Sequence, residues 1–405
     1  MRPLAERTTR IASSPTMQVT ATVDRMRREG IDVIDFGTGE PDFATPAHVA
    51  AAAHRAIDED FTKYTPVGGI HALKRAVCER YRLDYGVQYR ESDVIITAGG
   101  KQALFNAALA LFGPGDEVVL HGPSWPTLPE QVRLADAVPV VVDTRADEGF
   151  AIRAERLLGA VTPRTRGIII NSPANPTGAL MPEPELTLLA REAARRELWI
   201  VLDLCYEKLI YPTDTGERVA HNLPAVLAAH CPEQSVICGS TSKAYAMTGW
   251  RCGWAIGPSA VIGAQSAIQS HATSNVASIT QCAALEALTG PQDSVARMLD
   301  EFHRRRDSVH AWLNATPRYR AHKPQGAFYL FLDVTELLSP YGLRTSAEFA
   351  QALLEQSHVA VTPGEAFGAP GFVRISFATS MDLLREGSRR MVEFAQARTG
   401  QVTAG

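Results

Sequence analysis

The sequence predicts an α/β fold with a large domain, built on a mostly parallel central sheet covered by helices, and a smaller α+β domain. From about residue 90 to residue 260, short and wholly apolar segments alternate with helical patterns, as in parallel sheets buried on both faces. Near residue 290 the pattern changes to a long helix followed by a second set of apolar segments. A chain of 405 residues is long enough for both domains.

The elements of the large domain follow from hydrophobic periodicity. Residues 1–30 predict an arm that leads into a helix. Further helices are expected over 51–60, 68–86, 101–112 and 184–198. Strands are expected over 94–97, 117–120, 139–142, 167–170, 199–203, 235–238 and 251–257.

The C-terminal part predicts a connecting helix over 294–316, helices near 346–356 and 383–398, and apolar segments at 326–334, 359–364 and 372–379. We expect the N-terminal arm to pack on this part. The predicted division is therefore an arm and part of the small domain over 1–45, a large domain over 46–290, and the small domain with its connecting helix over 291–405.

Composition excludes several classes of function. A formal net charge of −4 gives no electrostatic case for binding nucleic acid or an anionic membrane. The chain has no apolar stretch near the ~20 residues of a membrane helix, and its polar start predicts no signal peptide. Six cysteines without a CxxC pair predict reduced thiols in a cytoplasmic protein. Eleven scattered histidines show no metal-ligand spacing, so no metal is expected.

Polar residues follow four of the predicted strands, where ligands bind in open parallel sheets. They are Ala98-Gly99-Gly100-Lys101, the segment 171–178 ("NSPANPTG"), Asp203 with Tyr206, and Gly239-Ser240-Thr241-Ser242-Lys243. Each has a simpler explanation when taken alone. A lone lysine is usually on the surface, an Asp after a strand is often a helix cap, and paired glycines can simply form a tight turn.

The two known phosphate-loop patterns do not fit. "AGGKQA" (98–103) lacks the GxxxxGK[ST] spacing, and "GTGEPD" (37–42) lacks the third glycine of a dinucleotide site. "AGGKQA" can still present backbone amides and a helix N-terminus to a phosphate.

In their order and spacing, these residues resemble the fold-type I pyridoxal-phosphate (PLP) enzymes. The chain is identified as a member of the class I aminotransferase family, and within it resembles the bacterial aspartate/prephenate branch. The resemblance covers nearly the whole chain, and the motifs that carry it are "GEPDFATP" (39–46), "YTPVGG" (64–69), "NSPANPTG" (171–178), "SKAYAMTGWRCGWAIGP" (242–258) and "VRISFATS" (373–380).

The resemblance implies Lys243, Asp203 and Tyr206 as catalytic residues. Lys243 would form the Schiff base with PLP, and Asp203 would pair with the protonated pyridine nitrogen, which is the electron sink. Tyr206 and Asn175 would bind the ring's phenolate oxygen. The other implied cofactor residues are Trp125 on the ring face, Gly99, Gly100, Ser240 and Arg251 on the phosphate, Lys101 nearby, and Tyr64 from the second subunit of a homodimer with composite active sites.

For the substrate, the resemblance implies that Arg374 binds the α-carboxylate, since a guanidinium fits a carboxylate with two parallel hydrogen bonds. Asn175, Trp125 and the backbone of Gly39 would assist. Lys101, Ser14 and Thr16 match positions that contact the substrate side chain, which favours an acidic donor. The implied activity moves an amino group between an amino acid and a 2-oxo acid through Schiff-base and pyridoxamine phosphate intermediates.

Two alternatives remain open at this point. "DLCY" (203–206) stands where the family usually has "DEIY", and Ser124 replaces a common aromatic residue. A specialised PLP enzyme on the same scaffold, catalysing elimination, cyclisation or oxidation, would keep the same cofactor residues. An aminotransferase-like sensor domain of a transcription regulator would carry an added DNA-binding domain, but this chain reaches "FGTGEPDF" by residue 43, which leaves no room for one.

Overall fold

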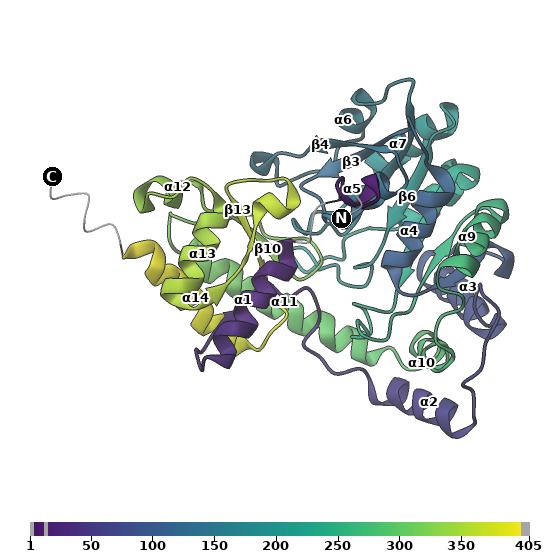
Figure 1. Ribbon diagram of the computed structural model, residues 1–405, viewed down its shortest axis with the longest axis horizontal. Helices are drawn as coiled ribbons and strands as arrows, with labels where there is room; N and C mark the ends of the chain where they lie inside the picture. The colour runs from purple at the N-terminus through teal and green to yellow at the C-terminus, as the bar shows by residue number, and fades with distance from the viewer. Residues whose placement is uncertain (1–3, 12–14, 398–405) are drawn as a thin grey trace.

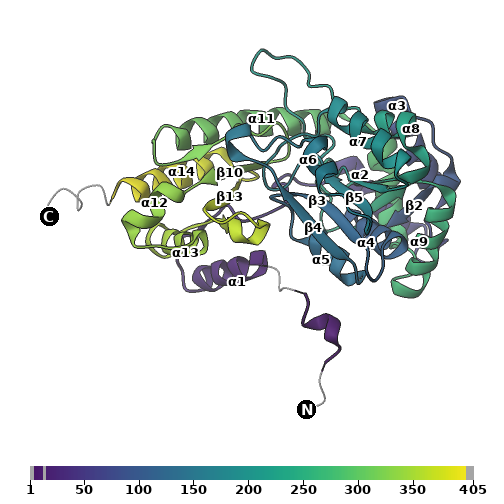
Figure 2. The same cartoon turned by 90° about the horizontal axis from the view of Figure 1, so that it is seen from above.

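The computed structural model describes residues 4–11 and 15–397, with the side chains of Arg7 and of residues 15–21 left out. Figure 1 shows two parts joined by the long helix α11 (Asp293–Asn314), one around a seven-stranded sheet and one around a smaller sheet. Seen from above in Figure 2, α11 runs along both parts. These two parts, each with its own sheet, confirm the predicted fold class. The domain boundaries at 45 and 290 stay a proposal.

The large sheet has the strand order β2-β8-β7-β6-β5-β3-β4. Strand β8 is antiparallel to both of its neighbours, β2 and β7, and the remaining pairs are parallel. The strands are β2 (Val94–Thr97), β3 (Glu117–Gly122), β4 (Val138–Asp143), β5 (Thr165–Asn171), β6 (Trp199–Asp203), β7 (Ser235–Ser240) and β8 (Gly253–Ile256).

Helices cover both faces of this sheet because its strands are apolar on both faces. Alternate residues of one strand enter different cores: Ile96 packs in one cluster and Ile95 in the other. The first face is covered by α2 (Ala47–Asp58), α3 (His71–Tyr85), α6 (Ala154–Gly159), α7 (Glu183–Arg195), α8 (Leu223–His230) and α10 (Ser278–Thr289). The second is covered by α4 (Gly100–Leu111), α5 (Thr127–Leu134) and α9 (Ser259–Ala272).

The smaller part holds a four-stranded antiparallel sheet in the order β12-β13-β10-β9. Its elements are β9 (Arg320–Ala321), β10 (Tyr329–Asp333), β12 (Thr362–Pro363) and β13 (Phe372–Ser376), with α12 (Thr335–Leu338), α13 (Ser346–Ser357) and α14 (Met381–Gln396). The core of this part draws on β10, β13, α11, α13 and α14.

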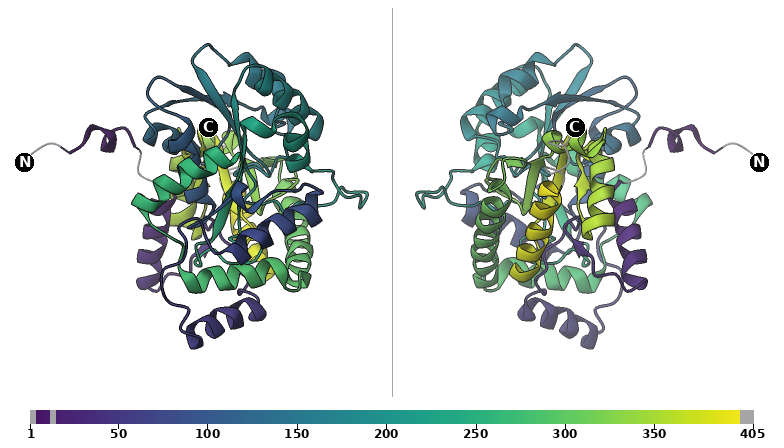
Figure 3. Two further views of the ribbon diagram at one scale, coloured as in Figure 1. Left: turned by 90° about the vertical axis from the view of Figure 1, so that its right-hand side faces the viewer. Right: turned by 90° about the vertical axis from the view of Figure 1, so that its left-hand side faces the viewer.

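The N-terminal segment packs on the smaller part, as the sequence predicts. Strand β1 (Ile34–Asp35) pairs in parallel with β11 (Val359–Ala360), so the N-terminal segment shares a two-stranded sheet with the smaller part. Val23 and Met26 of α1 (Pro15–Arg28) pack with Leu354 of α13. The short turn Glu6–Thr8 projects from the body (Figure 3).

Several helices have no clear signal in the sequence. Helix α10 carries small and apolar residues on most of its circumference and is buried by α2 and α3, so it lacks the polar face that makes a helical period visible. Helix α5 contains Pro129, which argues against a helix when the sequence is considered alone.

Three further observations bear on function. Over residues 4–11 and 15–397, no helix is long and apolar enough to cross a membrane. Across the same described ranges, no cluster of His, Cys, Asp and Glu has the make-up of a metal site. All six cysteines are free.

Candidate active site

A cleft of about 680 Å³ lies at the carboxyl ends of the large sheet's strands, against the smaller part. Eleven of the residues predicted from the sequence line it: Gly39, Gly100, Lys101, Trp125, Asn175, Asp203, Tyr206, Ser240, Lys243, Arg251 and Arg374. The convergence expected at the strand ends is therefore present in the fold. Whether these residues play the predicted chemical roles depends on the local geometry.

Asp203, the last residue of β6, is 2% exposed. Its Oδ1 accepts a hydrogen bond from the Cys205 N–H at 3.1 Å, and its Oδ2 accepts one from Nδ2 of Asn171 at 3.0 Å. Burial raises the pKa of the carboxyl to about 7, although both donors act in the opposite direction. A carboxyl with this pKa can share a proton with a basic ring nitrogen near neutral pH.

Lys243 follows β7, and its Nζ donates a hydrogen bond to the Gly39 carbonyl at 2.6 Å. Burial lowers the pKa of the amine, and the positive charges of Arg374 and Arg251 add to this, while Cys205 and Glu40 oppose it. A buried amine with a lowered pKa is available in its neutral, nucleophilic form.

Arg251 and the start of α4 form an anion-binding corner. Nη1 of Arg251 donates to the Thr248 carbonyl at 2.8 Å and Nη2 to the Ala98 carbonyl at 3.2 Å. Gly99 has φ +82°, and a Cβ built there would lie 2.5 Å from Nη2 of Arg251, so only glycine lets the guanidinium approach. The free N-terminus of α4, the guanidinium and the nearby Ser240 hydroxyl provide the donors that a phosphate requires.

Arg374 of β13 is 3% exposed and lies under the opposite end of the cleft. Its Nη1 donates to Oδ1 of Asn175 at 3.0 Å, and its Nη2 donates to the Gly37 carbonyl at 2.8 Å. Its Nε is buried without a partner, which leaves a donor for an incoming carboxylate. The guanidinium also lies 4.3 Å from the centre of the Tyr329 ring.

Two aromatic groups complete the walls. The hydroxyls of Tyr206 and Tyr329 are 2.8 Å apart, and burial raises the pKa of both phenols. On the other wall, Nζ of Lys101 lies 4.9 Å from the centre of the Trp125 ring. Burial and the Arg251 charge lower the pKa of Lys101.

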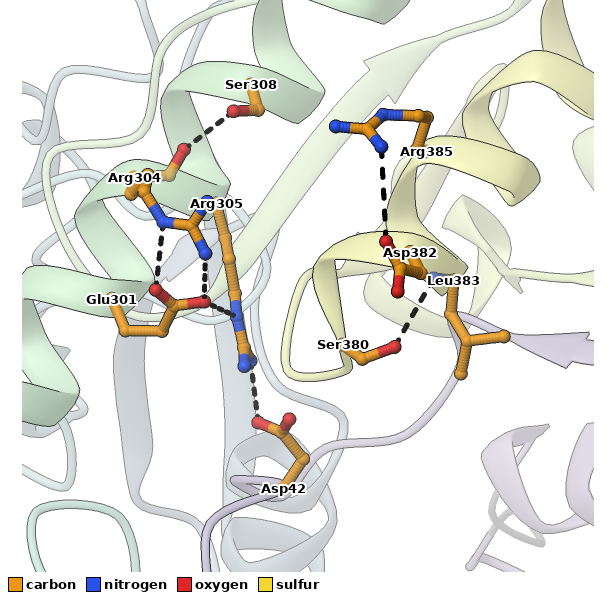
Figure 4. A network of polar contacts seen from close by, with 9 residues as sticks. All are labelled: Asp42, Glu301, Arg304, Arg305, Ser308, Ser380, Asp382, Leu383 and Arg385. Carbon is orange, nitrogen blue, oxygen red and sulfur yellow. Dashed lines mark hydrogen bonds and ion pairs between the residues drawn. The ribbon is translucent and has the colours of Figure 1, made fainter.

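The segment that carries Gly39 is fixed from outside the cleft. Nη1 of Arg305 on α11 donates to Oδ1 of Asp42 at 2.7 Å, and its Nε donates to Oε1 of Glu301 at 2.8 Å. Figure 4 shows this connection between the segment and the helix. The Arg305 side chain is 7% exposed and that of Asp42 is 29% exposed, so the pair is partly shielded from water.

Four predicted site residues do not line the cleft. Gly99 lies just beneath it, where it makes room for Arg251. Tyr64 is 91% exposed. Ser14 lies outside the described residues, and Thr16 belongs to α1 but its side chain is outside the described part of the chain.

Among the residues that line the cleft, Cys205 and Tyr329 were not predicted as site residues. Asn171 was expected at this rim as the first residue of the polar segment 171–178, but no role was assigned to it. Cys205 was noted only as a departure from the family's usual sequence. Tyr329 lies within an apolar strand of the smaller part, and no local pattern shows that this strand faces the cleft.

Residues 31–390 match the model of the family "Aminotransferase class I and II". The aspartate aminotransferase of Geobacillus stearothermophilus is 42% identical over 395 residues, covering 98% of this chain and 99% of that protein. The aspartate/prephenate aminotransferase of Cereibacter sphaeroides is 42% identical over 397 residues, covering 96% of this chain and 98% of that protein.

Solved structures give the same result. The aspartate aminotransferase of Rhizobium meliloti aligns with a TM-score of 0.92 at 39% identity, covering 98% of this chain and 99% of that chain. The aspartate aminotransferase of Thermus thermophilus, solved with maleate, aligns with a TM-score of 0.90 at 41% identity, covering 98% of this chain and 100% of that chain.

Proposed function

The chain belongs to the class I and II aminotransferases and is a PLP-dependent enzyme that acts on amino acids and 2-oxo acids. From this premise, we propose which residues bind PLP and which class of amino acid is the enzyme's preferred substrate. The observation that carries the proposal is that Asp203, Lys243 and Arg251 converge in one cleft with Arg374.

The cleft has the donors and acceptors that PLP requires. Asp203 would face the pyridine nitrogen, Trp125 the ring face, and Tyr206 with Asn175 the ring oxygen. Gly100, Ser240 and Arg251 would hold the phosphate, with Gly99 leaving space for the guanidinium. The unpartnered Nε of Arg374 at the other end fits a substrate carboxylate.

PLP supplies an electron sink that makes the Cα proton of a bound amino acid acidic. Lys243 lines the cleft, and burial lowers the pKa of its amine, so the neutral Nζ would take the Cα proton. The same amine would return the proton later in the reaction. Asp203 would hold the proton on the ring nitrogen, because a buried carboxylate stabilises the adjacent positive charge. Arg374 would orient the α-carboxylate so that the Cα–H bond points at Nζ.

We assign an acidic side chain to the preferred donor on the basis of Lys101. Its amine lies at the edge of the cleft, above Trp125, next to the N-terminus of α4, where the helix dipole favours an anion. A dicarboxylic amino acid would then be bound at one end by Arg374 and at the other by Lys101. Relatives with about 40% identity are named aspartate aminotransferases, and one solved relative holds maleate, a dicarboxylate.

The specialised PLP reaction is not favoured, because the relatives that match nearly the whole chain are named as aminotransferases.

The test compares kcat/KM for aspartate and for alanine in the wild type and in Lys101→Ser. One hydrogen bond to a charged group is worth about 1.5–3 kcal/mol, so the variant should lose about ten- to a hundredfold in kcat/KM for aspartate and little for alanine. Lys74→Ser is the matched control, since Lys74 is on α3 and lines neither of the cleft's walls. Equal losses for both substrates in Lys101→Ser would contradict the assignment.

We also propose a homodimer with composite active sites. Tyr64 is 91% exposed and lies outside the cleft of its own subunit, although its motif matches the segment that binds the cofactor phosphate in this family. Ile57 and Phe61, on the same stretch, are 49% and 38% exposed. An exposed apolar stretch of this kind favours burial against a second subunit.

A further inference from the structure

The Asn171 side chain touches both the carboxyl proposed for the pyridine nitrogen and the loop that carries Asn175. It ends β5 and is 2% exposed. Its Nδ2 donates to Oδ2 of Asp203 at 3.0 Å, and its Oδ1 accepts the backbone N–H of Asn175 at 2.8 Å. Asn175 in turn accepts a hydrogen bond from Nη1 of Arg374 at 3.0 Å. The chain of contacts runs from one end of the cleft to the other.

The two partners of Asn171 fix which way its amide points. A backbone N–H can only donate, so the atom facing Asn175 has to be the oxygen. The NH₂ group then faces the Asp203 carboxyl, which accepts. A flipped amide would place two donors together at Asn175 and two acceptors together at Asp203. Both buried partners therefore depend on one orientation of one side chain.

The backbone of Asn171 is held as well. Its N–H donates to Nε2 of His121 on β3 at 3.1 Å. Since this N–H can only donate, Nε2 carries no proton and the His121 ring is neutral. His121 is 3% exposed, so the strand end that presents the Asn171 amide is anchored inside the sheet.

We propose that Asn171 is a positioning residue that aligns the Asp203 carboxyl with the cofactor and, through Asn175, links this alignment to the substrate-carboxylate end of the cleft. The inference rests on the proposed role of Asp203. Without the amide, Asp203 keeps one donor, the Cys205 N–H, and its carboxyl can rotate about that single contact. The carboxyl would then face the ring nitrogen in the wrong orientation. This would weaken the electron sink, whereas PLP would still bind in the cleft.

The test uses the holoenzyme of Asn171→Ser and of Asn171→Asp. Serine is too short to reach both partners, and aspartate keeps the size but places an acceptor against Asp203. Three properties are measured: the pH titration of the bound cofactor's visible absorption without substrate, the Kd for PLP, and kcat with KM. We expect a shifted titration, kcat lower by about ten- to a hundredfold, and KM changed much less.

Asn106→Ser is the matched control. Asn106 is a buried asparagine on α4 whose Nδ2 donates to Oε1 of Gln269 at 3.0 Å, and it does not line the cleft. If Asn171 only supports the fold, both serine variants lower the melting temperature while the absorption titration and kcat stay at the wild-type values, and the proposal is overturned. Should Asn171→Ser not fold, Asn171→Asp carries the same test.

A double-mutant cycle with Asp203→Ala separates this inference from the proposed function. If Asn171 acts through Asp203, adding Asn171→Ser to Asp203→Ala produces little further change in the Kd for PLP or in the absorption titration. Full additivity of the two effects contradicts the inference. A wild-type absorption titration in Asp203→Ala instead contradicts the role of Asp203, whereas a shift in Asp203→Ala with none in Asn171→Ser overturns only the role of Asn171.

Discussion

At the inner end of the cleft, Asp203 is 2% exposed and accepts hydrogen bonds from Asn171 on the neighbouring strand and from the Cys205 N–H in the turn after β6, whereas at the outer end Lys101 is exposed and lies over the Trp125 ring. Asn171 and Asp203 are the last residues of two buried strands, so the sheet fixes their positions. Lys101 lies on the first turn of α4, and its side chain is not held between strands. In a site of this kind, the residues proposed for the cofactor are fixed by the sheet. The preference for one substrate over another can change through substitutions at the outer end.

The largest effect is expected at the inner end, from Asp203→Ala. If Asp203 faces the ring nitrogen as proposed, removing the carboxyl would let that nitrogen lose its proton, on which every covalent step depends. We expect kcat to fall by more than ~10⁴-fold, above the usual contribution of a single acid–base group. Steady-state kinetics and circular dichroism on the folded variant provide the measurement. A near-normal kcat would show that Asp203 is structural only and that the two ends do not differ in the way described.

A second effect concerns stability in the cofactor-free protein. Burial raises the pKa of Asp203 from 3.8 to about 7, so between these values the folded protein keeps a proton that the unfolded chain has lost. The unfolding free energy therefore falls as pH rises through this range, by ~4 kcal/mol from this one group. Asp203→Asn lacks this loss, and its stability relative to the wild type should increase steadily from pH 4 to pH 7.

Denaturant unfolding of both apoproteins at several pH values provides the check. His121 contributes with the opposite sign, because burial lowers its pKa to about 4 and stability rises with pH between 4 and 6.5. Both proteins contain His121, so its contribution cancels in the difference. Two parallel curves of unfolding free energy against pH would contradict the burial cost assigned to Asp203.

The features that could be predicted from the sequence lie mainly at the ends of the buried strands of the large sheet. The strands β2 and β6 have the predicted bounds, and the polar residues after them lie in the cleft, because a wholly apolar run that ends in a polar residue has few other structures. Helices α9 and α10 were not predicted, since burial on most sides removes their polar face. Tyr329 and the Asp42–Arg305 pair join segments far apart in the chain, which no local pattern reports.

A smaller effect is expected from Tyr64→Glu. If Tyr64 reaches the cofactor phosphate of the partner subunit, as proposed, a carboxylate at this position should weaken PLP binding at least about tenfold, the value of one hydrogen bond to a charged group with repulsion added. Mixing this variant with Lys243→Ala tests the shared site, because a mixed dimer contains one site with both native residues. Activity that stays at the sum of the two separate variants after mixing would rule out a composite site.

The proposed chemistry depends most on Lys243, since its amine is proposed both to hold PLP and to take the Cα proton of the substrate. Reduction of the holoenzyme with borohydride fixes PLP covalently to the lysine that holds it, and peptide mass mapping then identifies that residue. The chain offers matched competitors in Lys101, which also lines the cleft, and in Lys74, which does not. We expect the label on Lys243 alone and none in Lys243→Ala. A label on Lys101 or on any other lysine of the native enzyme would contradict the role proposed for Lys243.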